Sequence, residues 1–571
     1  MAGTDCMLPN VYGRGALFAF SALDGETSYD FDMVATLTEK PIGFRIETKS
    51  AQVFSLDVAE HLDFRFVTGD SIEAVSGAGD IFVAFLDRNT IVGYAPVCPA
   101  LTRETTINQD ENIRLPDLQV RMAVQMDGDR FVFAVCAHSD GDTAAAKAAE
   151  SLHCDYSRLK DERYAFYQSV PAVRCSDPDI NRLYYKAWSV NKLNIQSAQG
   201  AIPVRWTTPD RIPHRDMFLW DSGFHALSLV LYDTRLSEDA LRAVLSQQRE
   251  DGMIPIRMTP HRTENLTQPP VLAWSVWECY ERSGNRSFLS ETYTRLSDYI
   301  LWSFRNRDKD ADGLPEWQIS EQANCRSGES GMDNSPRFDN ALRMAAVDYA
   351  CYLVNEADCL ARMATVLGFA ADVKAWNDRK ASLTDKINEL LWCEEDGLYY
   401  DRNENGSFNK VPAVTSFLPL FARVCNETQA KRLVKHIRDK NSFFTEMPLP
   451  SVSRQYPKYS TDMWRGAVWL NMNYMVIRGL VNYGFTDLAG TLRNKTLDSV
   501  GAWYKKTGCI FEFYDADNRL SPTALWRKGP PTAIPDWRNK VHSIADYNWS
   551  ASFVIRMLVD TYGINDETET G

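Results

Sequence analysis

The sequence lacks several features that would assign the protein to common classes. Its 12 cysteines include no CxxC pair, and no dense cluster of Lys and Arg offsets a formal net charge of −14. It also has no apolar run that approaches the roughly 18 residues of a membrane span. A disulfide framework, a zinc site of paired cysteines and a phosphate-neutralising surface are therefore not indicated. We expect mostly buried, reduced thiols, no nucleic acid partner and no membrane partner.

Targeting and common catalytic motifs are also absent. The start of the chain, MAGTDCMLPN, has neither the basic region nor the apolar segment of a signal peptide, so we expect a cytoplasmic protein, or a secreted one whose signal peptide was removed. No nucleophile elbow, P-loop, Rossmann fingerprint or HExxH motif is found. The stretch RNRDKDADGL has alternating Asp residues like part of a calcium loop, but it lacks the Glu at the twelfth position. We interpret it as a solvated loop and predict neither a metal nor a cofactor.

What is present indicates a large globular protein with two unlike parts. The 571 residues are 44% hydrophobic and 24% charged, which is typical of folded domains and too long for one ordinary core. Between about residues 16 and 138, short segments of alternating hydrophobicity are separated by Gly, Asp, Asn and Pro. This pattern predicts a β-sandwich of antiparallel strands over residues 1–140. A stretch rich in Ala, Lys and Glu predicts a linker helix over residues 141–170.

From residue 171 to the end, strands give way to long amphipathic segments. About ten to twelve helices are predicted, and long polar loops lie between them. Segments that are apolar on nearly every face alternate with segments that have one polar face. This alternation suits two concentric rings of helices.

The loops carry several unusual residue combinations. In FLWDSGFHAL, Trp220 and Asp221 stand at the start of an apolar helix, where they are either a helix cap with a core tryptophan or part of a site. Gln268, in a proline-rich loop, could bind a hydroxylated ligand or fix its own loop. In DMWRGAVWLNMNY, core packing explains Trp469, whereas adjacent Trp464 and Arg465 are difficult to bury together because a guanidinium needs partners.

Two carboxylates stand out among these loops. Asp333 lies in ESGMDNSPRFD with Glu329 and Arg337 nearby, in a context that would otherwise be interpreted as a turn. Glu512 lies in GCIFEFYDADN, where alternation favours exposure to solvent and aromatic neighbours favour a pocket. Aromatic residues make up 12% of the chain and can stack on sugar rings as well as fill a core. Glycoside hydrolysis requires little more than two carboxyl groups on opposite sides of an acetal.

In this order, FLWDSGFHAL, ESGMDNSPRFD, WRGAVWLNMNY, FEFYDADN and DYNWS resemble the clan of the trehalases and glycoside hydrolase family 63. The resemblance extends over about residues 171–563. It implies a mainly α fold, an (α/α)6 barrel with an N-terminal β-sandwich domain, and inverting hydrolysis of an α-linked sugar at a non-reducing end. The implied partner is an oligosaccharide or small glycoside, and no oligomeric state is implied.

The resemblance also assigns roles by position. Asp333 matches the general acid and Glu512 the general base. Seven further residues match positions that line the sugar site or lie beside the acid: Trp220, Asp221, Gln268, Arg337, Trp464, Trp469 and Trp549. From the residue types within the same motifs, we also predict Glu329 and Arg465 as substrate-binding residues.

Three positions depart from the pattern of the clan and leave the substrate open. Gly328 stands where many relatives have Trp, Ala467 replaces a frequent Pro, and Arg519 stands near a frequent Gly. Within enzymes, the alternative is another (α/α)6 glycosidase of the trehalase or α-rhamnosidase type. Outside enzymes, the alternative is a carbohydrate-binding protein without catalysis, against which the presence of both carboxylates argues.

Overall fold

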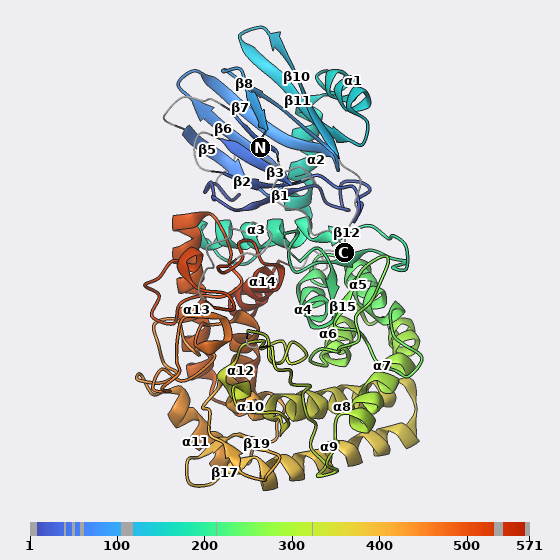
Figure 1. Cartoon of the computed structure of the whole chain (residues 1–571), viewed down its shortest axis with the longest axis vertical. Coiled ribbons are helices and arrows are strands. Elements are labelled where there is room, and N and C mark those ends of the chain that lie inside the picture. The colour runs from blue at the N-terminus through green and yellow to red at the C-terminus, as the bar shows by residue number, and fades with distance from the viewer. Residues whose placement is uncertain are drawn as a thin grey trace.

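A computed structural model of the chain describes residues 8–38, 42–47, 52–56, 62–103, 118–212, 214–322, 324–529 and 541–565. Its first part is β-rich and its second part is mainly helical, as the sequence predicted (Figure 1). No helix within these ranges combines the length and the apolar character that a membrane span requires.

The β-rich part consists of two antiparallel sheets. Their cores meet where Phe18 of one sheet packs 5.2 Å from Phe85 of the other, measured between ring centroids. One sheet has the order β1 (Leu17–Ala19), β2 (Val34–Leu37), β3 (Gly43–Glu47), β4 (Gln52–Ser55) and β9 (Ala100–Arg103). The other has the order β10 (Gln119–Asp127), β11 (Arg130–His138), β8 (Thr90–Ala95), β7 (Gly79–Asp87), β6 (Ser71–Ser76) and β5 (Leu62–Val67).

The segment expected as one linker helix forms two. Helix α1 (Gly141–Ser151) packs against β10 and β11, and α2 (Tyr156–Ser169) contacts β7. The chain breaks between them because Asp155 caps α2, accepting a hydrogen bond from the backbone N–H of Arg158. The segment therefore covers the sheets and does not simply lead away from them.

The helical part begins with a helix that the sequence marks clearly. Asp177 caps α3 and Pro178 occupies its first turn, which is the position that tolerates proline best. The helices are α3 (Pro178–Leu193), α4 (Leu219–Leu229), α5 (Thr234–Ser246), α6 (Leu272–Ser283), α7 (Arg286–Asn306), α8 (Val347–Leu367), α9 (Ala370–Leu390), α10 (Leu418–Phe421), α11 (Glu427–Ile437), α12 (Leu470–Asn482), α13 (Thr486–Thr507) and α14 (Asn548–Tyr562).

These helices are arranged in a cyclic order of contacts. Helices α4, α6, α8, α10, α12 and α14 each contact the next in the series, and α14 contacts α4. Helices α3, α5, α7, α9 and α13 pack against members of this series. The loops between them contain the short strands β12 (Ile195–Gln196), β13 (Trp206–Thr207), β14 (Met217–Phe218), β15 (Arg257–Met258), β16 (Met344–Ala345), β17 (Trp392–Cys393), β18 (Leu398–Tyr399), β19 (Asp401–Asn403) and β20 (Phe408–Asn409), and the 3-10 turns η1 (Pro336–Phe338), η2 (Val414–Phe417), η3 (Met463–Arg465) and η4 (Pro522–Ala524).

Buried charges join the two parts. Lys192, at the end of α3, is fully buried and its Nζ lies 2.9 Å from Asp24 and 2.6 Å from Asp70 of the β-rich part. Arg211 pairs in the same way with Asp32 at 2.7 Å. A buried charge is costly unless it is paired. Here the helical part supplies the cations, and the β-rich part supplies the carboxylates that compensate them.

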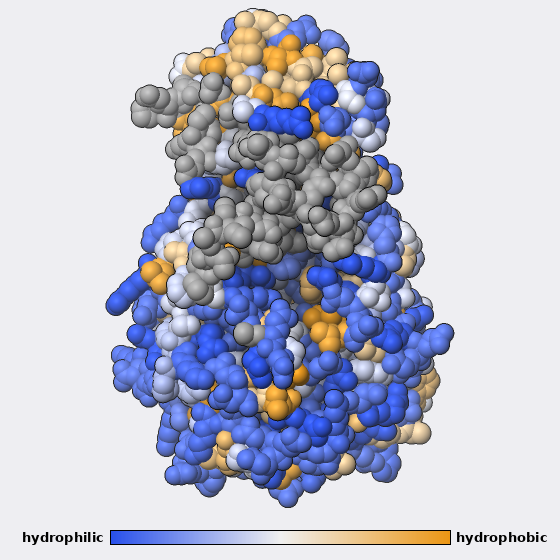
Figure 2. All heavy atoms as spheres, viewed as in Figure 1, coloured by the Kyte–Doolittle hydropathy of each residue, from blue (hydrophilic) through white to orange (hydrophobic). Residues whose placement is uncertain are grey.

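The surface reflects the same division. On the face drawn in Figure 2, the helical part presents mainly hydrophilic residues, and hydrophobic residues gather at the β-rich end. Met126, near the end of β10, is 55% exposed and belongs to this end.

Candidate active site

The loop that contains Asp333 is a turn, as its residue types indicate, but it is not an ordinary surface loop. The backbone carbonyl of Asp333 accepts the N–H of Arg326 at 2.9 Å. The carboxylate is only 17% exposed, and its Oδ2 lies 2.6 Å from Nζ of Lys528. The loop therefore presents a half-buried acid to a cation from a distant segment.

A glycine sets the position of this loop. Gly331 has a φ of +71°, and a Cβ atom there would lie 2.3 Å from Cζ2 of Trp220. Only glycine meets both demands, because other residues rarely adopt this backbone conformation and have no room here. Trp220, at the start of α4, thus supports the chain two residues before Asp333.

Glu512 is buried, which corrects the expectation from alternation that it faces solvent. Its exposed fraction is 2%, and its neighbours Phe511 and Phe513 are also buried. Bridges on both sides enclose the segment, since Val468 pairs with Tyr514 and Phe511 pairs with Ala545. The alternating pattern therefore belongs to a segment covered on both faces.

A guanidinium compensates the buried charge of Glu512. Nε of Arg527 donates to Oε2 of Glu512 at 3.0 Å, and Nη2 donates to Oε1 at 3.4 Å. Burial alone would lower the pKa of Arg527, but the adjacent carboxylate raises it above its ordinary value. Arg527 therefore remains charged and holds Glu512 in one orientation.

Asp333 and Glu512 form ion pairs with two cations that are consecutive in the chain. Lys528 pairs with Asp333, and Arg527 pairs with Glu512. The negative charge of Asp333 also raises the pKa of Arg527, so both carboxylates lie near this pair of residues. The backbone of this segment is itself fixed, because the N–H of Lys528 donates to Asp462 at 2.9 Å.

Asp221 lies in the first turn of α4 and is not its cap, which is Phe218. Burial raises the pKa of Asp221 well above its usual range, and the negative charges of Glu512 and Asp210 raise it further. Its Oδ1 is buried and has no hydrogen-bond partner among the described residues. Burial thus favours the neutral form of Asp221, in which the carboxyl group can both donate and accept a hydrogen bond.

Four tryptophans form a continuous aromatic cluster beside these acids. The rings of Trp464 and Trp469 stack at 3.8 Å with an interplanar angle of 3°. Trp549 packs edge-on against Trp469 at 5.7 Å and against Trp220 at 5.2 Å. Nε1 of Trp464 and Nε1 of Trp549 are buried without a partner in the described structure. Trp549 lies inside the cluster, at the start of α14.

Two predicted ligand-binding residues fix the backbone of the site. Gln268 accepts the backbone N–H of Trp220 at 3.2 Å through Oε1. Arg465 donates to the carbonyl of Asn334 at 3.1 Å and to both carboxylate oxygens of Asp339. Arg465 therefore links the turn η3 to the loop of the proposed acid.

Two further predicted residues are held by ion pairs within the protein. Arg337 is fully buried and directs its donors to Asp348 and Asp401, at 2.7 to 2.9 Å. Glu329 is fully buried, pairs with Arg307 and accepts backbone N–H groups. These contacts stabilise the loop and argue against a role of either side chain as a sugar contact.

The sequence does not mark Arg527 or Lys528 as residues of the site. The stretch TALWRKGPP that contains them resembles a solvated basic loop. The available signal was weak, namely a basic pair between the two motifs FEFYDADN and DYNWS.

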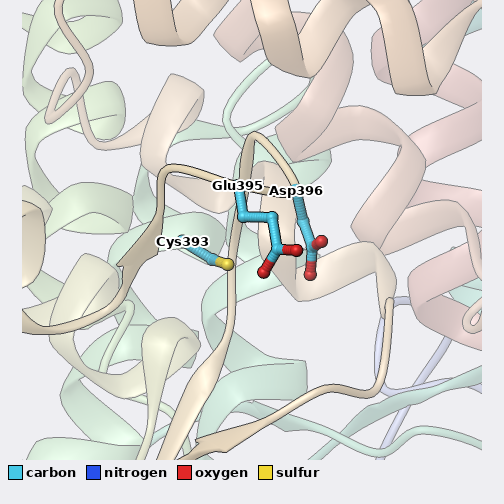
Figure 3. Close-up of side chains that lie close together, drawn as sticks. All are labelled: Cys393, Glu395 and Asp396. Carbon is cyan, nitrogen blue, oxygen red and sulfur yellow. The ribbon is translucent and has the colours of Figure 1, made fainter.

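Two acidic clusters in the described residues lie elsewhere in the chain. Figure 3 shows Cys393, Glu395 and Asp396 close together at the turn between β17 and β18, and Lys410 pairs with both carboxylates. The second cluster is Asp308, Asp310 and Asp312, whose carboxylates accept backbone N–H groups of their own loop. Exposed acidic groups of this kind are stable without an ion, and we assign no metal to either cluster.

Comparison with known sequences identifies a family. A sequence model described as the mannosylglycerate hydrolase MGH1-like glycoside hydrolase domain matches residues 213–550, more than half of the chain. An uncharacterized protein of Borreliella burgdorferi is 28% identical over 251 residues, which are 43% of this chain and 50% of that protein. Mannosylglycerate hydrolase MGH1 of Selaginella moellendorffii is 26% identical over 401 residues, 56% of this chain and 76% of that protein. The match thus spans only half of the Borreliella protein.

Solved structures are similar in fold. A mannosylglycerate hydrolase of family GH63 from Thermus thermophilus, in complex with glucose, has a TM-score of 0.53 and 24% identity over 65% of this chain and 99% of that one. A bacterial glucoamylase in complex with acarbose has a TM-score of 0.59 and 11% identity, and covers 97% of this chain and 98% of that one. The second match includes the β-rich part as well as the helices.

Proposed function

The chain belongs to the mannosylglycerate hydrolase MGH1-like glycoside hydrolase family, within GH63, and on this premise we propose that it is an inverting, exo-acting glycoside hydrolase. Its substrate is an α-linked sugar at a non-reducing end, with an α-glucoside as the first candidate. Asp333 is the general acid and Glu512 is the general base. One observation carries the proposal: two acids from distant motifs meet on Arg527 and Lys528, beside tryptophans with unused donors.

The proposal includes the architecture of the catalytic domain. Helices α4, α6, α8, α10, α12 and α14 form the inner ring of an (α/α)6 barrel, and the intervening helices form the outer ring. The cyclic order of helix contacts and the fold of the similar structures support this arrangement. We propose residues 171–571 as the barrel domain, residues 1–140 as the β-sandwich domain and residues 141–170 as the helical connection.

The reaction is a single displacement. Protonated Asp333 donates its proton to the glycosidic oxygen, while ionised Glu512 removes a proton from the water that attacks the anomeric carbon from the opposite face. An attacking water requires a separation of about 6.5 to 9.5 Å between the two carboxyl groups. The ion pair between Glu512 and Arg527 favours the ionised base that this mechanism needs.

The sugar is bound by groups that are buried and without partners. A pyranose ring presents C–H groups that pack on aromatic rings, and the cluster of Trp220, Trp464, Trp469 and Trp549 is the candidate for this contact. Oδ1 of Asp221 and the indole nitrogens of Trp464 and Trp549 lack partners in the described structure and are the candidate contacts of the sugar hydroxyl groups. Buried polar atoms without a partner are costly, so a hydroxylated ligand compensates their desolvation.

The test is a proton NMR time course with a panel of α-glycosides. The panel includes aryl α-glucosides, aryl α-mannosides, mannosylglycerate, trehalose and aryl α-rhamnosides. We expect the first-formed sugar to have the β configuration, because inversion at an α-linked carbon gives the β anomer. A first product in the α configuration contradicts the mechanism.

The panel also separates the alternatives. Hydrolysis of trehalose or rhamnosides alone indicates one of the other (α/α)6 glycosidases. Binding of a sugar without any hydrolysis, measured by calorimetry, indicates a carbohydrate-binding protein.

A further inference from the structure

A histidine lies between a carboxylate and the cation that holds the proposed base. Nδ1 of His214 is 2.8 Å from Oδ2 of Asp210, and Nε2 of His214 is 3.2 Å from Nη2 of Arg527. Arg527 in turn donates to Glu512. The four side chains form a chain of contacts that ends at the proposed general base.

The chemistry of arginine fixes the protonation of this histidine. A guanidinium has only donors, so Nε2 of His214 must be the acceptor in its contact with Arg527. The ring proton therefore lies on Nδ1 and is donated to Asp210. The contacts require a neutral imidazole with a defined tautomer, although an ordinary carboxylate neighbour favours a charged one.

Asp210 is held rigidly enough to orient the ring. Its Oδ1 accepts the backbone N–H of Ile212 at 2.6 Å and that of His214 at 3.2 Å. The next residue, Arg211, is fixed by its buried pair with Asp32 of the β-rich part. The N–H of Asn548 also donates to the carbonyl of Pro209.

We propose that His214, oriented by Asp210, is a positioning residue that fixes Arg527 on Glu512. The inference rests on the proposed function, in which Glu512 is the general base. Arg527 has several rotatable bonds, and Nη2 has only a long contact of 3.4 Å to Glu512. The acceptor Nε2 holds this end of the guanidinium and so keeps both Glu512 contacts formed.

The contacts of His214 suit a neutral ring. Nδ1 faces the carboxylate of Asp210 and Nε2 faces the guanidinium of Arg527. The rings of Phe218 and Tyr547 pack edge-on against the imidazole, with centroids 5.9 and 6.4 Å away. A proton on Nε2 would remove the lone pair that accepts from Arg527.

Two isosteric substitutions separate the two contacts. In His214→Gln, the amide oxygen can take the place of Nε2 and accept from Arg527. In His214→Asn, the amide nitrogen can take the place of Nδ1 and donate to Asp210, but nothing reaches Arg527. We expect H214Q to keep kcat within about threefold and H214N to lose about tenfold or more, with KM little changed in both.

A second histidine provides the matched control. His261 pairs with Asp30 at 2.9 Å but is 55% exposed, and it forms no hydrogen bond with an arginine among the described residues. The substitutions H261Q and H261N should leave kcat unchanged. Equal losses in H214Q and H214N would overturn the inference, because they would indicate a packing role.

A measurement without turnover separates this inference from the proposed function. Nitrogen-15 NMR of histidine-labelled protein at pH 8, assigned with H214Q, should show His214 protonated at Nδ1 and unprotonated at Nε2. In Arg527→Met this tautomer preference should weaken. An Nε2–H tautomer in the unsubstituted protein overturns the inference even if the enzyme is active. If no substrate is hydrolysed, the expected tautomer still supports the contact with Arg527.

Discussion

The loop of residues 329–339 and the segment of residues 510–514 each present one carboxylate, in different surroundings. Asp333 is half-buried and pairs with a lysine, whose flexible side chain makes one contact. Glu512 is buried and pairs with an arginine that makes two contacts and is fixed by His214. The arginine suits a base that must stay ionised until water attacks, whereas the lysine opposes the protonated form that the proposed acid needs.

Removal of either carboxylate should have the largest effect and should reveal the difference directly. We expect Asp333→Asn and Glu512→Gln each to lower kcat on aryl glycosides by about a thousandfold, within the range for general acid and base groups. On an α-glycosyl fluoride, whose leaving group needs no proton, D333N should recover activity and E512Q should not. Circular dichroism should give native spectra for both. Equal recovery by the two variants would contradict the assignment of roles.

Loss of the arginine at the base should have the next largest effect. Arg527→Met leaves Glu512 buried without its partner, which costs about 3 kcal/mol of unfolding free energy and should lower kcat by about a hundredfold. Urea denaturation and initial rates measure the two effects. The control is Arg454→Met, since Arg454 pairs with Asp517 at the surface and should cost less than about 1 kcal/mol. Similar losses in the two variants would argue against a special role for Arg527.

A substitution at Gly331 should displace the loop that contains Asp333 without removing a charged group. Gly331→Ala introduces strain at a φ of +71° and a contact with Trp220, so we expect a loss of about 1 to 3 kcal/mol and about tenfold in kcat. Gly368→Ala is the control, because Gly368 has a φ of +86° and no atom within 4 Å of the new Cβ. It should lose stability but keep its activity. A normal kcat in G331A would indicate that the loop adjusts freely.

Removal of the lysine beside the acid should have the smallest effect at neutral pH. The ammonium group of Lys528 stabilises the ionised form of Asp333, and the mechanism needs the protonated form. In Lys528→Met we therefore expect kcat to change by only a few fold near pH 7 and not to fall. Initial rates measure the effect. The control is Lys458→Met, which removes a cation from Asp339 of the same loop and should leave kcat unchanged. A loss of about tenfold or more in Lys528→Met alone would contradict this expectation.

The sequence predicted the general organisation because strands and helices leave patterns in short segments of the chain. Alternating hydrophobicity located the strands of the β-rich part, and helical periodicity located helices such as α9 and α14. The motifs that contain Asp333 and Glu512 were found by resemblance, and the structure places these two residues in one neighbourhood.

The remaining features depend on partners that are distant in the chain. Arg337 was expected at the sugar site, beside the acid, because of the family resemblance, and nothing near it in the sequence indicates its pairs with Asp348 and Asp401. Arg527 and Lys528 lie in a loop without periodicity, so the sequence gives no sign that each meets an acid. A charged residue can be assigned to a functional site or to a buried ion pair only when the residue that carries the opposite charge is known.

The buried charges between the β-rich part and the helices affect how the protein unfolds. Lys192 and Arg211 depend on Asp24, Asp70 and Asp32 for their compensation. Separation of the β-rich part would break these pairs and would also expose the apolar surface of the single core that both parts share. The chain should therefore melt in one cooperative transition, and a fragment that begins after the strands should be insoluble.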